Sequence, residues 1–215
     1  MTFFDRIKKD RHFRITTFLF ASFVVNVAYA EFLFIVSLLY SSKWFSAMSV
    51  YYALLSTARI FIFTKIDPKT PLRKKLSTIR WCGYFLLLIN MAVSTIMFIL
   101  LYRVPPVEHH EITVIALATY TFSTLTIAIV NGIRFAKQKA YVYFCAKIIS
   151  LTAASVSLTT LTNTMLATFG AENALLRSII LPCLCGSVAI FIIGCAITMI
   201  YKATLAMRKL NHETK

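Results

Sequence analysis

Six apolar runs, each long enough to cross a lipid bilayer, divide this chain of 215 residues. A helical span needs about 20 mostly apolar residues, because the hydrocarbon core is about 30 Å thick and each helical residue rises about 1.5 Å. With 59% hydrophobic residues and no long polar segment, the chain is too apolar for a soluble domain of this size. We therefore expect an all-α fold, a polytopic transmembrane bundle of six helices at residues 15–40, 44–64, 79–102, 112–133, 141–169 and 176–201.

The lysine and arginine residues predict how this bundle is oriented. Most of the 23 lie before the first span, in the second and fourth connections, and after the last span. The other three connections hold only Lys43, Arg103 and Arg177. Positive residues are in excess on the cytoplasmic side of membrane proteins. We therefore expect a protein of the plasma membrane with both termini in the cytoplasm. We also expect three parts: a basic segment 1–14, the membrane domain 15–201 and a basic tail 202–215.

The net charge of +15 is explained by this topology, so we expect no nucleic-acid partner. Segment 1–14 also resembles a short interfacial helix, with Phe3, Phe4 and Ile7 on one face and basic residues elsewhere. Such a helix would bind anionic lipid at the cytoplasmic face. The alternative is that the segment acts only as a topology signal.

Charged side chains inside the spans are the first candidates for function, because a charge in lipid usually faces the bundle interior or an aqueous cavity. Arg59 and Lys147 lie near the cytoplasmic ends of their spans, where a long side chain can also extend to the headgroups. Glu31 lies deeper, and its side chain is too short to do so. Asn26 and Asn90 lie at similar depths in the first and third spans. We predict that these five residues line a substrate cavity.

Two arrangements are open for Glu31, because an ionised carboxylate in lipid needs a partner or water. Arg59 has the opposite charge, although the estimated depths of the two residues differ by about 13 Å at about 1.5 Å per residue. Alternatively, Glu31 faces a cavity, where it would bind a cationic solute or relay protons.

The one cluster of potential metal ligands is Glu108-His109-His110-Glu111. Its histidines are adjacent and not one helical turn apart, as the HExxH arrangement requires, so we interpret it as a solvated loop. The sequence also lacks a phosphate-binding loop and a nucleophile elbow. We therefore expect a protein that is not an enzyme and that uses no metal or other cofactor.

Three stretches together resemble a group of small six-span membrane proteins of Gram-positive bacteria that have no assigned function. They are Tyr-Tyr-Ala-Leu-Leu at 51–55 through Arg59, Ala-Thr-Tyr-Thr-Phe at 118–122 through Asn131, and Lys-Ile-Ile-Ser-Leu at 147–151. The resemblance covers most of the chain and implies six helices and a role for Arg59 and Lys147. The chain departs from the group at 160–162, where Thr-Leu-Thr replaces an expected glutamine-containing segment.

These features favour a small-molecule transport or solute-binding membrane module. The alternative is a non-catalytic membrane subunit or regulator that docks a partner protein or a second copy of the chain through small-residue helix faces and basic loops. The two hypotheses differ in where the polar side chains point: into a shared cavity for the first, and into helix contacts for the second.

Overall fold

The computed structural model describes residues 11–63, 71–103, 111–134, 141–169 and 174–213. Within these ranges the chain is entirely helical, which confirms the predicted fold class. All six helices are long and apolar enough to span a membrane, so the chain is an integral, multi-pass membrane protein. The helices are α2 (Arg11–Tyr40), α3 (Lys43–Phe63), α4 (Leu72–Arg103), α5 (Glu111–Arg134), α6 (Tyr141–Phe169) and α7 (Ala174–Glu213).

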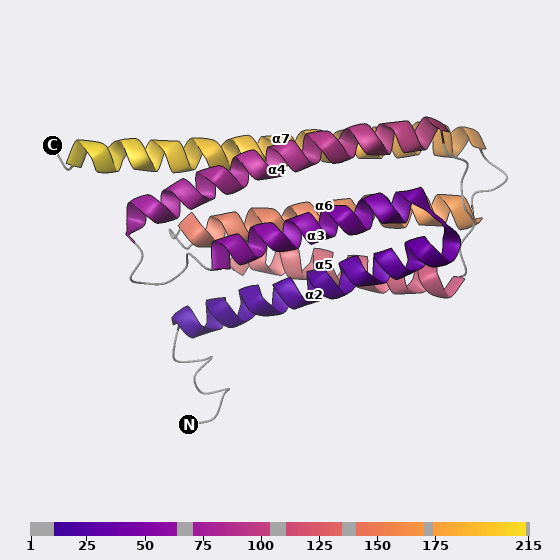
Figure 1. The fold of residues 1–215 in the computed structure, drawn as a ribbon, viewed down its shortest axis with the longest axis horizontal. Coiled ribbons are helices and arrows are strands. Elements are labelled where there is room, and N and C mark those ends of the chain that lie inside the picture. Colours follow the sequence, from indigo (N-terminus) through magenta and orange to yellow (C-terminus); the bar gives the residue numbers. More distant parts are fainter. Residues whose placement is uncertain (1–10, 64–70, 104–110, 135–140, 170–173, 214–215) are drawn as a thin grey trace, which may run out of the picture.

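The helices form three layers of two (Figure 1). The central layer is α3 with α6, and it lies between the pair α4 and α7 on one side and the pair α2 and α5 on the other. In the apolar windows of α3 and α6, 56% and 61% of residues are buried, against 17% in α7. Large apolar side chains such as Leu39, Phe98 and Ile190 are exposed on the outside of the bundle, where lipid would cover them.

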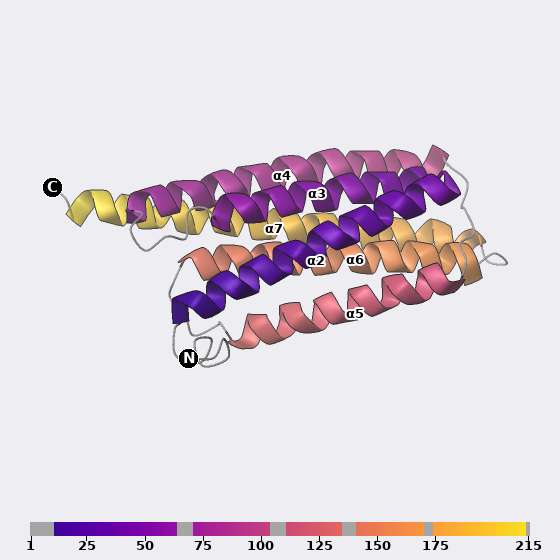
Figure 2. The same ribbon diagram turned by 60° about the horizontal axis from the view of Figure 1, so that its bottom comes forward.

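The two halves of the chain cross these layers in the same order, but their helices run in opposite directions along the membrane. Helices α2, α3 and α4 occupy successive layers, and α5, α6 and α7 repeat that sequence of layers (Figures 1 and 2). Because each half has three spans, α5 runs opposite to α2, α6 opposite to α3, and α7 opposite to α4. This is the arrangement of an inverted repeat.

We call the end of the bundle where α2 begins and α7 ends the basic end, because basic residues of two described helices lie there: Arg73, Lys74, Lys75 and Arg80 near the start of α4, and Lys202, Arg208 and Lys209 near the end of α7. Two helices continue beyond the predicted spans at this end. Helix α4 begins at Leu72 and not at 79, and α7 continues to Glu213, through most of the predicted tail 202–215. Hydropathy marks where a chain leaves lipid, and a helix does not have to end there. Of the predicted interfacial segment 1–14, residues 1–10 lie outside the described residues, and residues 11–14 are the start of α2.

The turn between α2 and α3 shows why the chain reverses at this point. Ser41 follows the last residue of α2 and has a left-handed backbone, with a φ of 50°. The amide of Ser42 donates to the carbonyl oxygen of Ser37 at 3.1 Å, which closes a Schellman motif. Across the two helices, the Ser49 hydroxyl donates to the Ala30 carbonyl oxygen at 2.8 Å. These contacts fix α2 against α3.

Near the basic end, α4 and α7 are in close contact at Gly83. A Cβ atom at this position would lie 2.7 Å from Cγ1 of Ile200 and 3.4 Å from the backbone oxygen of Ala196. Only a residue without a side chain allows the two helices to approach so closely.

We expect Gly83→Ala to lower the free energy of unfolding by about 1 kcal/mol, because overpacking outweighs the better helix propensity of alanine. In an Ile200→Ala background the clash is gone, so the same change should become stabilising. Thermal unfolding in detergent of the wild type, the two single variants and the double variant measures both effects. A stabilising Gly83→Ala change in the background with Ile200 intact would contradict the close contact.

Candidate functional site

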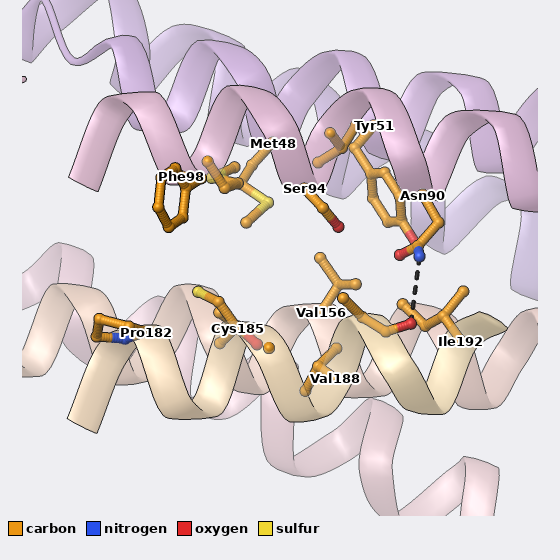
Figure 3. A pocket seen from close by; sticks show the side chains of 15 residues that line it. Met48, Tyr51, Asn90, Ser94, Phe98, Val156, Pro182, Cys185, Val188 and Ile192 are labelled. Atoms are coloured by element: carbon orange, nitrogen blue, oxygen red, sulfur yellow. Dashed lines mark hydrogen bonds between the residues drawn. The ribbon is translucent and has the colours of Figure 1, made fainter. Parts of the chain in front are cut away.

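One cavity, which we call the larger cavity, lies between the central layer and the α4–α7 layer, in the half of the bundle away from the basic end. Its volume is about 270 Å³. The residues around it come from α3, α4, α6 and α7 and are mostly apolar, with Tyr51, Asn90, Ser94 and Thr159 as the polar members. Figure 3 shows Phe98 and Pro182 at one end of the cavity, and Tyr51 and Asn90 toward the other.

Two polar side chains, Tyr51 and Asn90, lie at one end of this larger cavity. The Tyr51 side chain is only 1% exposed, and its hydroxyl has no hydrogen-bond partner among the described residues. The amide nitrogen of Asn90 donates to the carbonyl oxygen of Ala189 at 3.2 Å, which leaves its carbonyl oxygen to accept (Figure 3). A buried hydroxyl without a partner is costly, so a polar ligand atom at this end would be stabilised.

The smaller cavity contains Arg59 and lies between the central layer and the α2–α5 layer. We call it the arginine cavity. Its volume is about 120 Å³. The residues around it are Ala21, Ser22, Val25, Asn26, Arg59, Thr124, Ile127, Ser150 and Ala153. Arg59 is four residues from the end of α3, which places this cavity in the half nearer the basic end.

Arg59 is buried, with 4% of its surface exposed, and does not extend out of the bundle. Its Nη1 donates to the Ser22 hydroxyl, and Nη2 lies 3.4 Å from the Ser150 hydroxyl. Amide orientation is assigned from the hydrogen-bond network. In the orientation that satisfies both ends of the Asn26 amide, its oxygen accepts from Nε at 2.9 Å and from Nη2 at 3.1 Å. Arg59 therefore connects α3 to α2 and α6.

A cluster of tyrosines packs next to Asn26, one of the residues around the arginine cavity. In that orientation the Asn26 amide nitrogen donates to the Tyr120 hydroxyl at 3.0 Å. The Tyr120 ring stacks on Tyr29, with 3.4 Å between centroids. Tyr52 meets Tyr29 edge-on at 4.7 Å, and its hydroxyl donates to the carbonyl oxygen of Ala153 at 2.8 Å. Tyr52 itself lines neither cavity, but it lies between residues that do. Its chain neighbour Tyr51 lines the larger cavity, and its hydrogen-bond partner Ala153 lines the arginine cavity.

The five predicted residues lie in different places. Asn26 and Arg59 are in direct contact, whereas Asn90 lines the other cavity. Lys147 is half-buried on α6, one turn before Ser150. Glu31 is exposed on the outer face of α2, whereas Arg59 is buried. The described contacts of Arg59 are to Ser22, Ser150 and Asn26 and do not include Glu31. A contact of any of the five with a substrate stays a prediction.

Several residues at these cavities were not predicted as site residues. Ser22 and Ser150 line the arginine cavity, Tyr51 lines the larger cavity, and Tyr52 and Tyr120 contact residues that line the cavities. All five are polar but uncharged, and such side chains are common at ordinary helix contacts in membranes. Their one signal is that three tyrosines lie in the interior of spans and not at the headgroup level, where tyrosine is usually enriched. The Glu108–Glu111 cluster lies outside the described residues, apart from the backbone of Glu111.

Comparisons with protein-family models, with curated proteins and with solved structures found no match.

Proposed function

We propose that this chain is a small-molecule transport or solute-binding membrane protein, and that the larger cavity is its binding site. The observation that carries this proposal is that Tyr51 and Asn90 lie together at one end of a mostly apolar cavity. Binding sites for small molecules are mostly apolar, with a few polar groups that orient the ligand. A volume of about 270 Å³ suits a small solute with one polar end.

The position of the cavity supports transport. Helices α4 and α7 are in close contact at Gly83 near the basic end, and the larger cavity lies beside them in the other half of the bundle. Rocking of one layer about this contact would change access to the cavity. The opposite directions of the two halves support the same mechanism, because many secondary transporters move one repeat against the other around a central site. In this proposal the basic end faces the cytoplasm of a plasma membrane and contacts anionic lipid.

A second candidate function, a subunit that docks a partner protein or another copy, is favoured by Glu31. Its side chain is exposed on the outer face of α2, in the interior of a span. Acidic residues in spans almost always face a protein interior or water. A helix of another subunit against this face would remove Glu31 from lipid.

A matched pair of glycines on α7 tests the transport proposal. Gly186 borders the larger cavity and Gly194 borders neither cavity, and a Cβ at either position would meet open space. Helical spacing places Gly186 on the same face as Pro182 and Ala189. A leucine at 186 would therefore extend into the cavity, and each substitution should add about 1 kcal/mol of helix propensity.

We expect a small molecule to co-purify with the gently extracted wild-type protein, as native mass spectrometry would show. Gly186→Leu should lower its occupancy about tenfold or more, and Gly194→Leu should leave it unchanged. Thermal unfolding checks that both variants are at least as stable as the wild type, so that a lost ligand cannot reflect unfolding. Equal occupancy in the two variants would exclude the larger cavity as the site. A stoichiometric second polypeptide with no solute would favour the docking function.

A further inference from the structure

Arg59 places a full positive charge among neutral groups. Its contacts to the described residues are to the hydroxyls of Ser22 and Ser150 and the amide of Asn26. Glu31 is the only acidic residue within the six spans, and it lies on the outer face of α2. Burial of an ion without a counter-ion is strongly unfavourable in a medium of low dielectric constant. An anion in the arginine cavity would offset that cost.

The guanidinium group has room to bind such an anion. Arginine carries about five N–H donors in a planar fork, and the contacts to the described residues engage four of them, one at the long distance of 3.4 Å. A carboxylate on the edge formed by Nη1 and Nη2 would take the remaining N–H and replace the long contact to Ser150. Two parallel N–H to oxygen bonds are the usual geometry for arginine and carboxylate.

The rest of the arginine cavity is mostly apolar, with Thr124 as its other polar residue, and it continues to the surface. Ala21 and Val25 line it from α2, and Ile127 lines it from α5. Val25 and Ile127 are each 48% exposed, so the cavity reaches the outside of the bundle between these two helices, which lie in the same layer. This surface faces lipid in a membrane-spanning bundle. A ligand here therefore meets a cation at its inner end and apolar side chains toward the bilayer.

We propose that the arginine cavity is a binding site for the carboxylate group of a small amphipathic monoanion. Arg59 binds the carboxylate, and the apolar part of the ligand lies along Val25 and Ile127. Lys147, one turn before Ser150 on α6, adds positive potential on the side of the basic end. The site is separate from the larger cavity, so this inference does not depend on the proposed transport function.

The ligand can come from water or from the bilayer, and two probes distinguish these sources. The protein is placed in nanodiscs of zwitterionic lipid and titrated with sodium butyrate, or prepared in nanodiscs that contain increasing fractions of oleate. The readout is the midpoint of thermal unfolding, which rises with ligand concentration when only the folded protein binds. Butyramide has a similar shape without the charge and serves as the control ligand.

We expect a saturable rise in the midpoint with at least one carboxylate and none with butyramide. Arg59→Gln should raise the dissociation constant about tenfold or more, since it removes a charge-assisted contact. Response to butyrate alone identifies an aqueous ligand, and response to oleate alone identifies a lipid-derived one. No saturable response to either probe would overturn the proposal.

A second pair of variants keeps the test decisive if Arg59→Gln does not fold. Ala21 and Ala28 are both exposed on α2, and only Ala21 lines the arginine cavity. Ala21→Phe should fill the cavity and abolish the response, and Ala28→Phe should leave the response unchanged. Carboxylate binding that is equal in these two variants would place the ligand elsewhere. Loss of this binding with an intact larger-cavity ligand would leave the proposed function unaffected.

Discussion

Replacing Asn26 with leucine is expected to lower the free energy of unfolding by about 2–3 kcal/mol, because it removes the best acceptor of a buried charge. The Asn26 oxygen accepts from both Nε and Nη2 of Arg59, at 2.9 and 3.1 Å. Leucine has a similar size but accepts no hydrogen bond, and lipid offers no water in its place. The loss should exceed the roughly 0.6 kcal/mol that neutral hydrogen bonds between membrane helices contribute on average.

A double-mutant cycle separates this loss of a charge partner from a loss of packing. In an Arg59→Leu background the charge is absent, so Asn26→Leu should cost much less, with a coupling energy of about 1–3 kcal/mol. Reversible unfolding in mixed micelles, followed by circular dichroism, measures all four proteins. The neutral control is Thr57→Val, because the Thr57 hydroxyl bonds only to the carbonyl oxygen of its own helix at Ala53. A cycle with no coupling would show that Asn26 and Arg59 act independently.

The membrane-spanning architecture could be predicted from sequence because lipid restricts what a span can contain. Long apolar runs identify the six helices in the right order. The start of α4 at Leu72 and the continuation of α7 to Glu213 could not be predicted, because a helix rich in lysine and arginine can extend into water without a change in secondary structure. Hydropathy reports the solvent around a residue and not the end of a helix.

The sequence could not predict which face of each helix is buried, and this limits how much of the candidate site could be predicted. Asn26 and Glu31 lie on the same helix, five residues apart, and therefore point about 140° apart at about 3.6 residues per turn. Asn26 is buried and Glu31 is exposed. In a soluble protein, hydrophobic periodicity would identify the buried face. In a membrane both the lipid and the bundle interior are apolar, so that signal is absent.

Contacts between helices that are far apart in the sequence could not be predicted either. Helices α4 and α5 are neighbours in sequence, yet they lie in the two outer layers with the central layer between them (Figure 1). The chain could not show that Tyr29, Tyr52 and Tyr120, from three helices, meet in one cluster. Arg59 was predicted as a cavity residue on its charge, whereas Ser22 and Ser150 became recognisable only through their contacts with it.

The tyrosine cluster leads to the other large expected effect, which concerns both stability and permeability. Tyr52 is fully buried, contacts Tyr29 and Tyr120, and lies between Tyr51, which lines the larger cavity, and Ala153, which lines the arginine cavity. Tyr52→Ala should lower the free energy of unfolding by about 3–5 kcal/mol, as is usual when an aromatic ring is removed from a packed interior. Tyr52→Phe keeps the ring and loses the hydroxyl that donates to the Ala153 carbonyl oxygen, so it should cost about 1 kcal/mol or less.

The same pair of variants tests whether the Tyr52 ring separates the two cavities. Without the Tyr52 ring, the space around Tyr51 and the space around Ala153 would join, because these residues line the two cavities on either side of it. Liposomes that contain Tyr52→Ala should therefore leak small anions faster than wild-type liposomes, as an entrapped halide-sensitive dye would report. Tyr52→Phe should keep the low permeability of the wild type, because the ring and not the hydroxyl closes the path. Equal leakage in the alanine and phenylalanine variants would mean that the barrier lies elsewhere. Leakage in the alanine variant alone would identify Tyr52 as a barrier between a cavity in one half of the bundle and a cavity in the other, which is the arrangement that controlled passage across the membrane requires.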